Sequence, residues 1–142
     1  MKEVKRFDTK ILVIDDSEKD RTDITKNFMS IGYPYTVAIE YKDPLKTAGK
    51  LKPALIVIGY LGERTPAISR LELCRQIRNE DYGKGIAVIL TSYIPGSHTI
   101  FGTPFREICL GAGADDFFEK KFIINGKADL DVRIQAAIQK YM

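Results

Sequence analysis

The chain has 142 residues, 44% of them hydrophobic and 29% charged, and its formal net charge is +3. These values predict a single globular domain over residues 1–142 and exclude long disordered segments. The basic residues are scattered, so nucleic acid is an unfavoured partner, and no apolar run approaches the ~20 residues of a membrane helix. Because the N-terminus also lacks an apolar signal segment, we expect a cytoplasmic protein with no membrane partner.

The first half of the chain alternates short apolar runs with helix signals. Residues 11–14 have the pattern of a buried strand, and Ser17 can cap the helix that follows. A weaker strand pattern covers 35–39, and a short helix is predicted over Asp43–Leu51. The next apolar run, 54–58, is continuous and rich in β-branched residues, which is typical of a parallel strand.

The second half continues the alternation. A helix over about 69–78 precedes a strand at 86–90, and apolar residues at helical spacing predict a further helix over 105–112. A short strand at 116–118 is followed by the clearest amphipathic helix, at 130–141. Five βα units in series predict a three-layer α/β sandwich, with an open parallel sheet and right-handed crossovers.

Polar residues follow the predicted strands, where open α/β sheets bind their ligands. Asp15 and Asp16 follow the first strand, Gly59 the third, Thr91 the fourth and Lys120 the fifth. Paired carboxylates can hold a hard cation such as Mg²⁺, and a hydroxyl with an ammonium group can bind phosphoryl oxygens. The alternative for the acid pair is that it only caps the first helix.

Five sequence blocks carry a family resemblance: ILVIDDS (11–17), PALIVIG (53–59), LELCRQIR (71–78), VILTS (88–92) and GADDFFEKKF (113–122). In this order they resemble the response-regulator receiver family of two-component and phosphorelay signalling, over a core of about residues 8–141. The resemblance implies a flavodoxin-like, doubly wound (βα)5 fold with strand order 2-1-3-4-5. It also implies that an aspartate at the end of the third strand accepts a phosphoryl group from a histidine kinase, beside two acids that bind Mg²⁺.

Carried over by residue, Asp15 and Asp16 match the family's acid pair, Thr91 its hydroxyl switch residue and Lys120 its lysine. The phospho-acceptor position falls on Gly59, which has no side chain to phosphorylate. We therefore expect no catalytic residue and a vestigial pocket that binds Mg²⁺ weakly at best, because cation affinity depends on the number of charged ligands. Without the acceptor carboxylate, Lys120 is expected to pair with Asp15 or Asp16 and to hold the site in one state.

Other departures from the family pattern point the same way. Phe117 occupies the family's aromatic switch position without a hydroxyl group, and Lys121 replaces the proline that usually follows the lysine. The loops 60–70 and 92–103 are longer than usual. Within the first of them, Glu63 is the next acid after the acceptor position and is interpreted as an exposed loop charge.

The leading hypothesis is a pseudo-receiver: not an enzyme, independent of cofactors, and acting by binding a histidine kinase, another receiver or an output protein. The family's signalling face corresponds to 104–111, 116–118 and 130–141, and it is also the face through which a homodimer is conceivable. The apolar residues of loop 92–103 either contact a partner or pack onto the domain's own core. Because the chain ends after the last helix with no DNA-binding domain, we expect a stand-alone adaptor or a domain excised from a larger protein.

Two other functions stay open. In one, the domain still accepts or binds a phosphoryl group with Mg²⁺, using Asp15 or Asp16. In the other, it binds a small ligand or nucleic acid on a flavodoxin-like scaffold, although no Gly-rich phosphate loop follows the first strand and fold alone decides nothing here.

Overall fold

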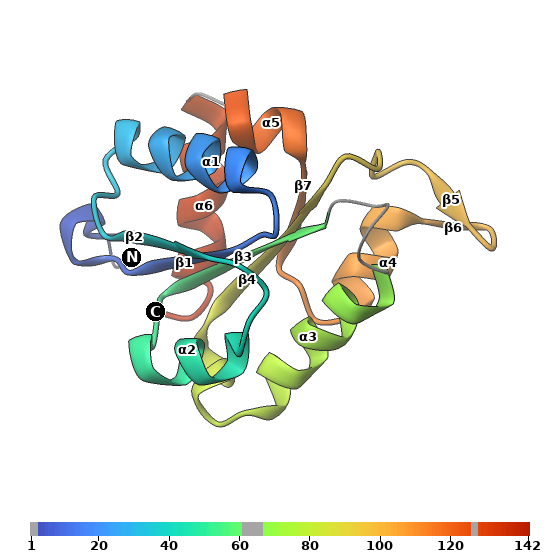
Figure 1. Cartoon of the computed structure of the whole chain (residues 1–142), viewed down its shortest axis with the longest axis horizontal. Helices are drawn as coiled ribbons and strands as arrows, with labels where there is room; N and C mark the ends of the chain where they lie inside the picture. Colours follow the sequence, from blue (N-terminus) through green and yellow to red (C-terminus); the bar gives the residue numbers. More distant parts are fainter. Residues whose placement is uncertain (1–2, 61–66, 126–127) are drawn as a thin grey trace.

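A computed structural model describes residues 3–60, 67–125 and 128–142 (Figure 1). Its centre is a five-stranded parallel sheet in the order β2-β1-β3-β4-β7. The strands are β1 (Ile11–Ile14), β2 (Thr36–Ile39), β3 (Leu55–Tyr60), β4 (Ala87–Ser92) and β7 (Asp116–Glu119). Since β7 is the fifth strand of this sheet along the chain, the predicted order 2-1-3-4-5 and the doubly wound architecture are confirmed.

Helices cover both faces of the sheet (Figure 1). They are α1 (Glu18–Ser30), α2 (Pro44–Leu51), α3 (Ala67–Asn79), α4 (Phe105–Gly111), α5 (Lys120–Asn125) and α6 (Ala128–Gln139). Helices α2, α3 and α4 lie on one face, and α1, α5 and α6 lie on the other. Short 3-10 turns occupy Arg6–Asp8 and Tyr82–Gly85. Helix α1 begins as predicted, because the Ser17 hydroxyl accepts a hydrogen bond from the Asp20 amide.

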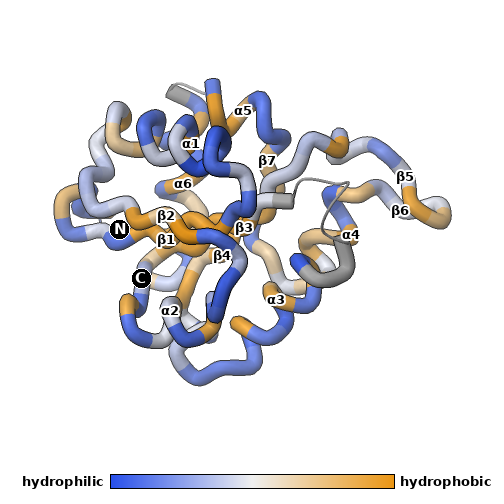
Figure 2. Tube along the Cα trace, viewed as in Figure 1, coloured by the Kyte–Doolittle hydropathy of each residue, from blue (hydrophilic) through white to orange (hydrophobic). Residues whose placement is uncertain are grey.

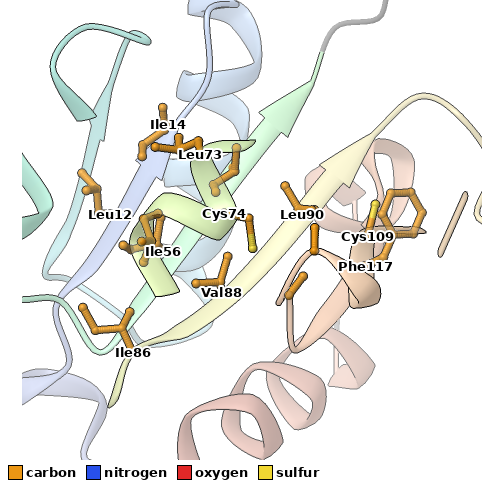
Figure 3. Close-up of a cluster of buried hydrophobic side chains, with 14 of the residues drawn as sticks. Leu12, Ile14, Ile56, Leu73, Cys74, Ile86, Val88, Leu90, Cys109 and Phe117 are labelled. Atoms are coloured by element: carbon orange, nitrogen blue, oxygen red, sulfur yellow. The ribbon is translucent and has the colours of Figure 1, made fainter. Parts of the chain in front are cut away.

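The side chains of each strand point alternately to the two faces of the sheet, so every strand contributes to both halves of the core. In β1, Leu12 and Ile14 belong to the core cluster on the face of α2, α3 and α4, whereas Ile11 and Val13 belong to the cluster on the face of α1, α5 and α6. Figure 3 shows the first of these clusters, in which Cys74 of α3 packs over the sheet. Both faces are buried, which is why the strand sequences are continuously apolar. The central strands are accordingly the most hydrophobic segments of the trace (Figure 2).

Two elements differ from the sequence prediction. Part of the predicted loop 92–103 folds into an antiparallel hairpin, β5 (Thr99–Ile100) with β6 (Thr103–Pro104). In addition, the chain after the last strand enters the six-residue helix α5 at once, in a stretch for which the sequence predicted no element. Both elements are too short to produce a period in the sequence.

Most of the other long loop, 60–70, lies outside the residues that the structure describes. Residues 61–66 are not among the described residues, so the predictions for Glu63 and for most of loop 60–70 stay predictions. Within the described ranges, no helix has both the length and the apolar character needed to cross a membrane.

Candidate functional site

The predicted site residues do meet at the carboxyl edge of the sheet. Asp15 directly follows β1, Gly59 lies near the end of β3 in register with Thr91 of β4, and Lys120 begins α5 directly after β7. Parallel strands carry these positions to one edge because their carboxyl ends point the same way. The site is thus built by the sheet and by the first turn of the short helix α5.

Lys120 lies at the centre of this edge and is fully buried between two carboxylates. Its Nζ donates to Asp15 Oδ2 at 2.5 Å and to Asp20 Oδ2 at 2.7 Å. Both carboxylates are themselves buried, so the ion pairs are shielded from solvent. The sequence predicted that Lys120 pairs with Asp15 or Asp16, and the observed pair with Asp15 confirms that prediction. Formally, the three side chains leave one net negative charge.

Sequence reasoning missed Asp20 as a member of this site. Its place in the first turn of α1 already has a local explanation, because a helix N-terminus favours negative charge. The backbone amide of Asp20 also donates to Ser17 Oγ at 3.1 Å. The one available signal was its position five residues after Asp15, which returns a side chain of α1 toward the edge of the sheet.

Gly59 has a direct steric relation to Asp15. An ideal Cβ built on Gly59 would lie 1.9 Å from Asp15 Oδ2 and 2.6 Å from Asp15 Cγ. The Asp15 carboxylate is further fixed because Oδ1 accepts from the Ser17 amide at 2.9 Å. In this arrangement, Asp15 therefore occupies the space that any side chain at position 59 would need.

Asp16 turns away from Asp15 and pairs with an arginine. Arg70 of α3 donates to Asp16 Oδ2 at 2.6 Å and, through Nε, to the Gly59 carbonyl at 3.2 Å. The Arg70 guanidinium is buried and lies 3.6 Å from the centre of the Tyr41 ring. The Tyr41 amide also donates to Asp16 Oδ1. Arg70 was missed because it lies in a predicted helix with nothing to mark it as reaching the acid pair.

Thr91 and Phe117 lie side by side around a separate small cavity. Thr91 is buried, and its Oγ1 has no hydrogen-bond partner among the described residues. The cavity measures about 10 Å³ and is lined by Thr91, Phe117 and residues of α3 and α4. Phe117 packs edge to face against Phe105, with ring centres 5.4 Å apart. Thus the two residues at the predicted switch positions contact this cavity and make no hydrogen bond to the Lys120 cluster.

Tyr93 covers the Lys120 cluster from the segment after β4. Its hydroxyl lies 2.8 Å from Asp20 Oδ1 and 3.0 Å from Oδ2, and Lys120 Nζ lies 5.1 Å from its ring centre. Burial of the hydroxyl and its hydrogen bond to Asp20 raise the pKa of Tyr93 to about 12, so the phenol remains a donor at neutral pH. Sequence reasoning placed Tyr93 in a loop and did not connect it to the site.

The acid pair does not fit a bound Mg²⁺ in this arrangement. Asp15 is engaged by Lys120 and Asp16 by Arg70, so each carboxylate already has a cation from the chain itself. Within the described residues, no group of three or more His, Cys, Asp or Glu side chains is arranged to hold a metal ion. Hard divalent cations need several oxygen ligands that converge.

Comparisons with known proteins agree with this fold. No family model matches the chain. The alkaline phosphatase synthesis transcriptional regulatory protein PhoP of Bacillus subtilis is 29% identical over 131 residues, which is 92% of this chain and 49% of that protein. The chain thus spans about half the length of the curated relatives that it matches.

Solved structures show the same architecture. The chemotaxis protein CheY4 of Vibrio cholerae, at 18% identity, superposes with a TM-score of 0.69 over 91% of this chain and 98% of its own. An atypical orphan response regulator, at 19% identity, superposes with a TM-score of 0.67 over 92% of this chain and 96% of its own.

The order of the sheet and the residues at its carboxyl edge define a receiver-type α/β domain. Over 92% of its length the chain is similar to response regulators of two-component systems, and its fold is the one that the solved receiver domains share.

Proposed function

We propose that this domain is a pseudo-receiver, a protein-interaction module that works without phosphorylation and is not an enzyme. One observation carries the proposal. The Asp15 carboxylate, bonded to Lys120, fills the space beside Gly59 that an acceptor side chain would need. A phosphoryl group at position 59 would have neither an attachment point nor room.

The charges of the site support the same conclusion. Lys120 and Arg70 bring positive charge to the two acids, which a receiver of the ordinary kind would use for Mg²⁺. Opening this arrangement for a metal would break the buried pairs Lys120–Asp15 and Arg70–Asp16, and breaking a buried pair costs about 3–5 kcal/mol. The domain therefore needs no metal cofactor to hold its folded state.

The partner is proposed to be a protein: a histidine kinase, another receiver or an output protein. The candidate face comprises α4, β7 and α6. Asp116 of β7 accepts a hydrogen bond from Arg106 of α4 at 2.7 Å and one from Arg133 of α6 at 2.6 Å. These pairs link the three elements of the face. The solved structure of an atypical orphan response regulator, similar in fold to this chain, is described as revealing a phosphorylation-independent regulatory mechanism. The same mode of action is proposed here, in the cytoplasm.

The test is phosphoryl transfer from acetyl phosphate with Mg²⁺, measured by intact mass. A competent receiver serves as positive control, and an Asp15→Ala/Asp16→Ala variant serves as negative control. We expect no added phosphoryl mass while the competent receiver is labelled. An adduct on this chain that disappears in the double variant would refute the proposal and identify one of the two acids as the acceptor.

A second candidate, non-covalent anion binding, is favoured by the buried Thr91 hydroxyl that has no partner among the described residues. Titration with inorganic phosphate, followed by amide NMR shifts, tests it. Saturable shifts at Thr91 and Lys120 that are lost in Thr91→Val would support anion binding. Shifts that do not saturate would exclude it.

A further inference from the structure

Arg70 is the one buried arginine among the described residues, with 2% of its side chain exposed. Burying a guanidinium is costly unless carboxylates or other oxygen acceptors pair with it. Its position near the N-terminal end of α3 adds to that cost, because a helix N-terminus disfavours positive charge. The helix therefore gives no local reason for a buried arginine here, and the reason lies in the groups that the side chain contacts.

Two oxygen acceptors of the chain meet the Arg70 guanidinium. Its Nη2 donates to Asp16 Oδ2 at 2.6 Å, and its Nε donates to the Gly59 carbonyl at 3.2 Å. Carboxylate and backbone carbonyl oxygens are also the ligands that hold hard divalent cations such as Mg²⁺. The Tyr41 ring covers the guanidinium, with its centre 3.6 Å from Arg70 Cζ. The guanidinium is thus fixed beside oxygens of the type that a metal ion would use.

Asp16 is the acid of the pair that faces solvent. Its side chain is 37% exposed, whereas the Asp15 side chain is fully buried beside Lys120. A cation that enters from solvent would therefore meet Asp16 first, at the edge where open α/β sheets bind their ligands. The position next to Asp16 is already taken by a cation that belongs to α3 and cannot dissociate from the chain.

We infer that Arg70 is the residue that excludes divalent cations from this site, because its guanidinium takes the place of a metal ion beside Asp16 and the Gly59 carbonyl. The occupancy of a metal site follows the concentration of the ion, but a tethered guanidinium is always present. The Asp16 side of the site should consequently be indifferent to the concentration of Mg²⁺. This inference rests on the proposed function and deepens it, since it names the residue on which metal independence depends.

Titration with Mn²⁺ tests the inference, with the electron paramagnetic resonance signal of the unbound ion as the readout. Arg70→Ala should bind one Mn²⁺ saturably with a Kd of about 0.1–1 mM, the range of weak oxygen-ligand sites. The unmodified chain should bind the ion at least about tenfold more weakly, which corresponds to the loss of one such site. Arg70→Gln removes the charge and keeps more of the side chain's packing, so it serves as a second variant.

Two controls locate the gained binding. Arg70→Ala combined with Asp16→Asn lacks the carboxylate and should lose the affinity that Arg70→Ala gains. Arg6→Ala also takes an arginine away from an aspartate, because Arg6 pairs with Asp131 outside this site. It should bind Mn²⁺ no better than the unmodified chain. Equal gains in Arg6→Ala and Arg70→Ala would mean that any aspartate without its arginine binds the ion, which would overturn the inference.

Thermal unfolding supplies a second readout. A ligand that binds only the folded chain raises Tm, so Mg²⁺ should raise the Tm of Arg70→Ala and of Arg70→Gln above the value in NaCl of equal ionic strength. The Tm of the unmodified chain should be the same in both salts. Mn²⁺ binding by the unmodified chain as tight as by the variants would overturn the inference, and so would variants that gain neither binding nor Tm.

The inference and the pseudo-receiver proposal fail in different experiments. Phosphoryl labelling of the unmodified chain would refute the pseudo-receiver proposal. Variants of Arg70 that bind no cation would refute only the role of Arg70, because the unmodified chain would still be unlabelled by acetyl phosphate.

Discussion

Two buried ion clusters lie at opposite edges of the sheet, and they are built differently. At the carboxyl edge, Lys120 contacts Asp15 and Asp20 through side-chain bonds. At the amino edge, Asp115 pairs with Arg78 at 2.6 Å. The amino-edge cluster also bonds extensively to the backbone, whereas the carboxyl-edge cluster makes few backbone bonds.

The amino-edge cluster joins several elements of the fold. Arg78 of α3 donates to the carbonyls of Gly83, Ile86 and Gly113, and Asp115 accepts from the Val88 amide. Such a cluster acts as a structural brace. At the carboxyl edge, the chain's own cations contact carboxylates at the place where this fold binds ligands. The difference predicts that changes at one edge mainly alter stability, while changes at the other also alter what the site can accept.

The largest effect is expected for Lys120→Met, which leaves Asp15 and Asp20 buried without a cation. The free energy of unfolding should fall by about 3–5 kcal/mol, as measured by urea denaturation. Adding Asp15→Asn and Asp20→Asn removes the unpaired charges and should restore most of this loss. A single variant as stable as the parent would show that the cluster is not electrostatically coupled.

Asp115→Asn tests the brace at the amino edge. Burial opposes ionisation of Asp115, but hydrogen bonds from Lys140, Tyr141 and the Val88 amide, with the charge of Arg78, hold its pKa below 3.8. A lowered native pKa stabilises the fold above pH 3.8, and this contribution disappears as the pH falls through the native value. The variant should lose about 2–3 kcal/mol at pH 7.

The pH dependence provides the control for Asp115→Asn. Between pH 5 and pH 2, the variant's unfolding free energy should fall less steeply than the parent's, because one depressed carboxylate is gone. Equal slopes would mean that Asp115 titrates alike in the folded and unfolded chains.

Gly59→Ala measures the steric conflict at the candidate site. Its Cβ would lie 1.9 Å from Asp15 Oδ2, so we expect a loss of about 1–3 kcal/mol from overpacking. In an Asp15→Ala background the conflicting carboxylate is absent and only the Cβ contact at 3.1 Å remains, so the same change should cost clearly less. Additive effects in this double-mutant cycle would contradict the proposed occupation of the space by Asp15.

Tyr93→Phe should have the smallest effect, about 1 kcal/mol, because it removes only the hydrogen bond to Asp20. Hydrogen exchange should quicken in the segment after β4 and remain unchanged in α6. The phenol that the variant loses from the parent's absorbance titration should have a pKa of about 12. If the phenol titrates near its ordinary value of 10, the bond is not formed in solution.

The sheet was predictable from sequence because its strands are buried on both faces. The runs 11–14, 54–58 and 86–90 are continuous and apolar, and all lie in or overlap observed strands. Helix α5 and the β5–β6 hairpin were not predictable, because six residues and two-residue strands show no period. The turn at Phe101 also lacks the Asn-Gly or Asp-Gly signal of common hairpins.

The site was predictable only where residues directly follow strands. Asp15 and Lys120 were found because parallel strands bring their ends together. Asp20 and Arg70 come from helices and Tyr93 from the segment after β4, so their contacts depend on how those elements pack. The sequence position of a long side chain does not reveal which of several acids it reaches.

The ion pair between Lys120 and Asp15 also has a consequence for the order of folding. The two residues are 105 positions apart in the chain, and Lys120 reaches the edge only after β7 has joined the sheet. Contacts of such long range form late, after the loop-closure entropy has been lost. Lys120→Met should therefore accelerate unfolding and leave the refolding rate nearly unchanged in stopped-flow experiments. The ion pair that Lys120 makes with Asp15 would then be among the last contacts of the molecule to form.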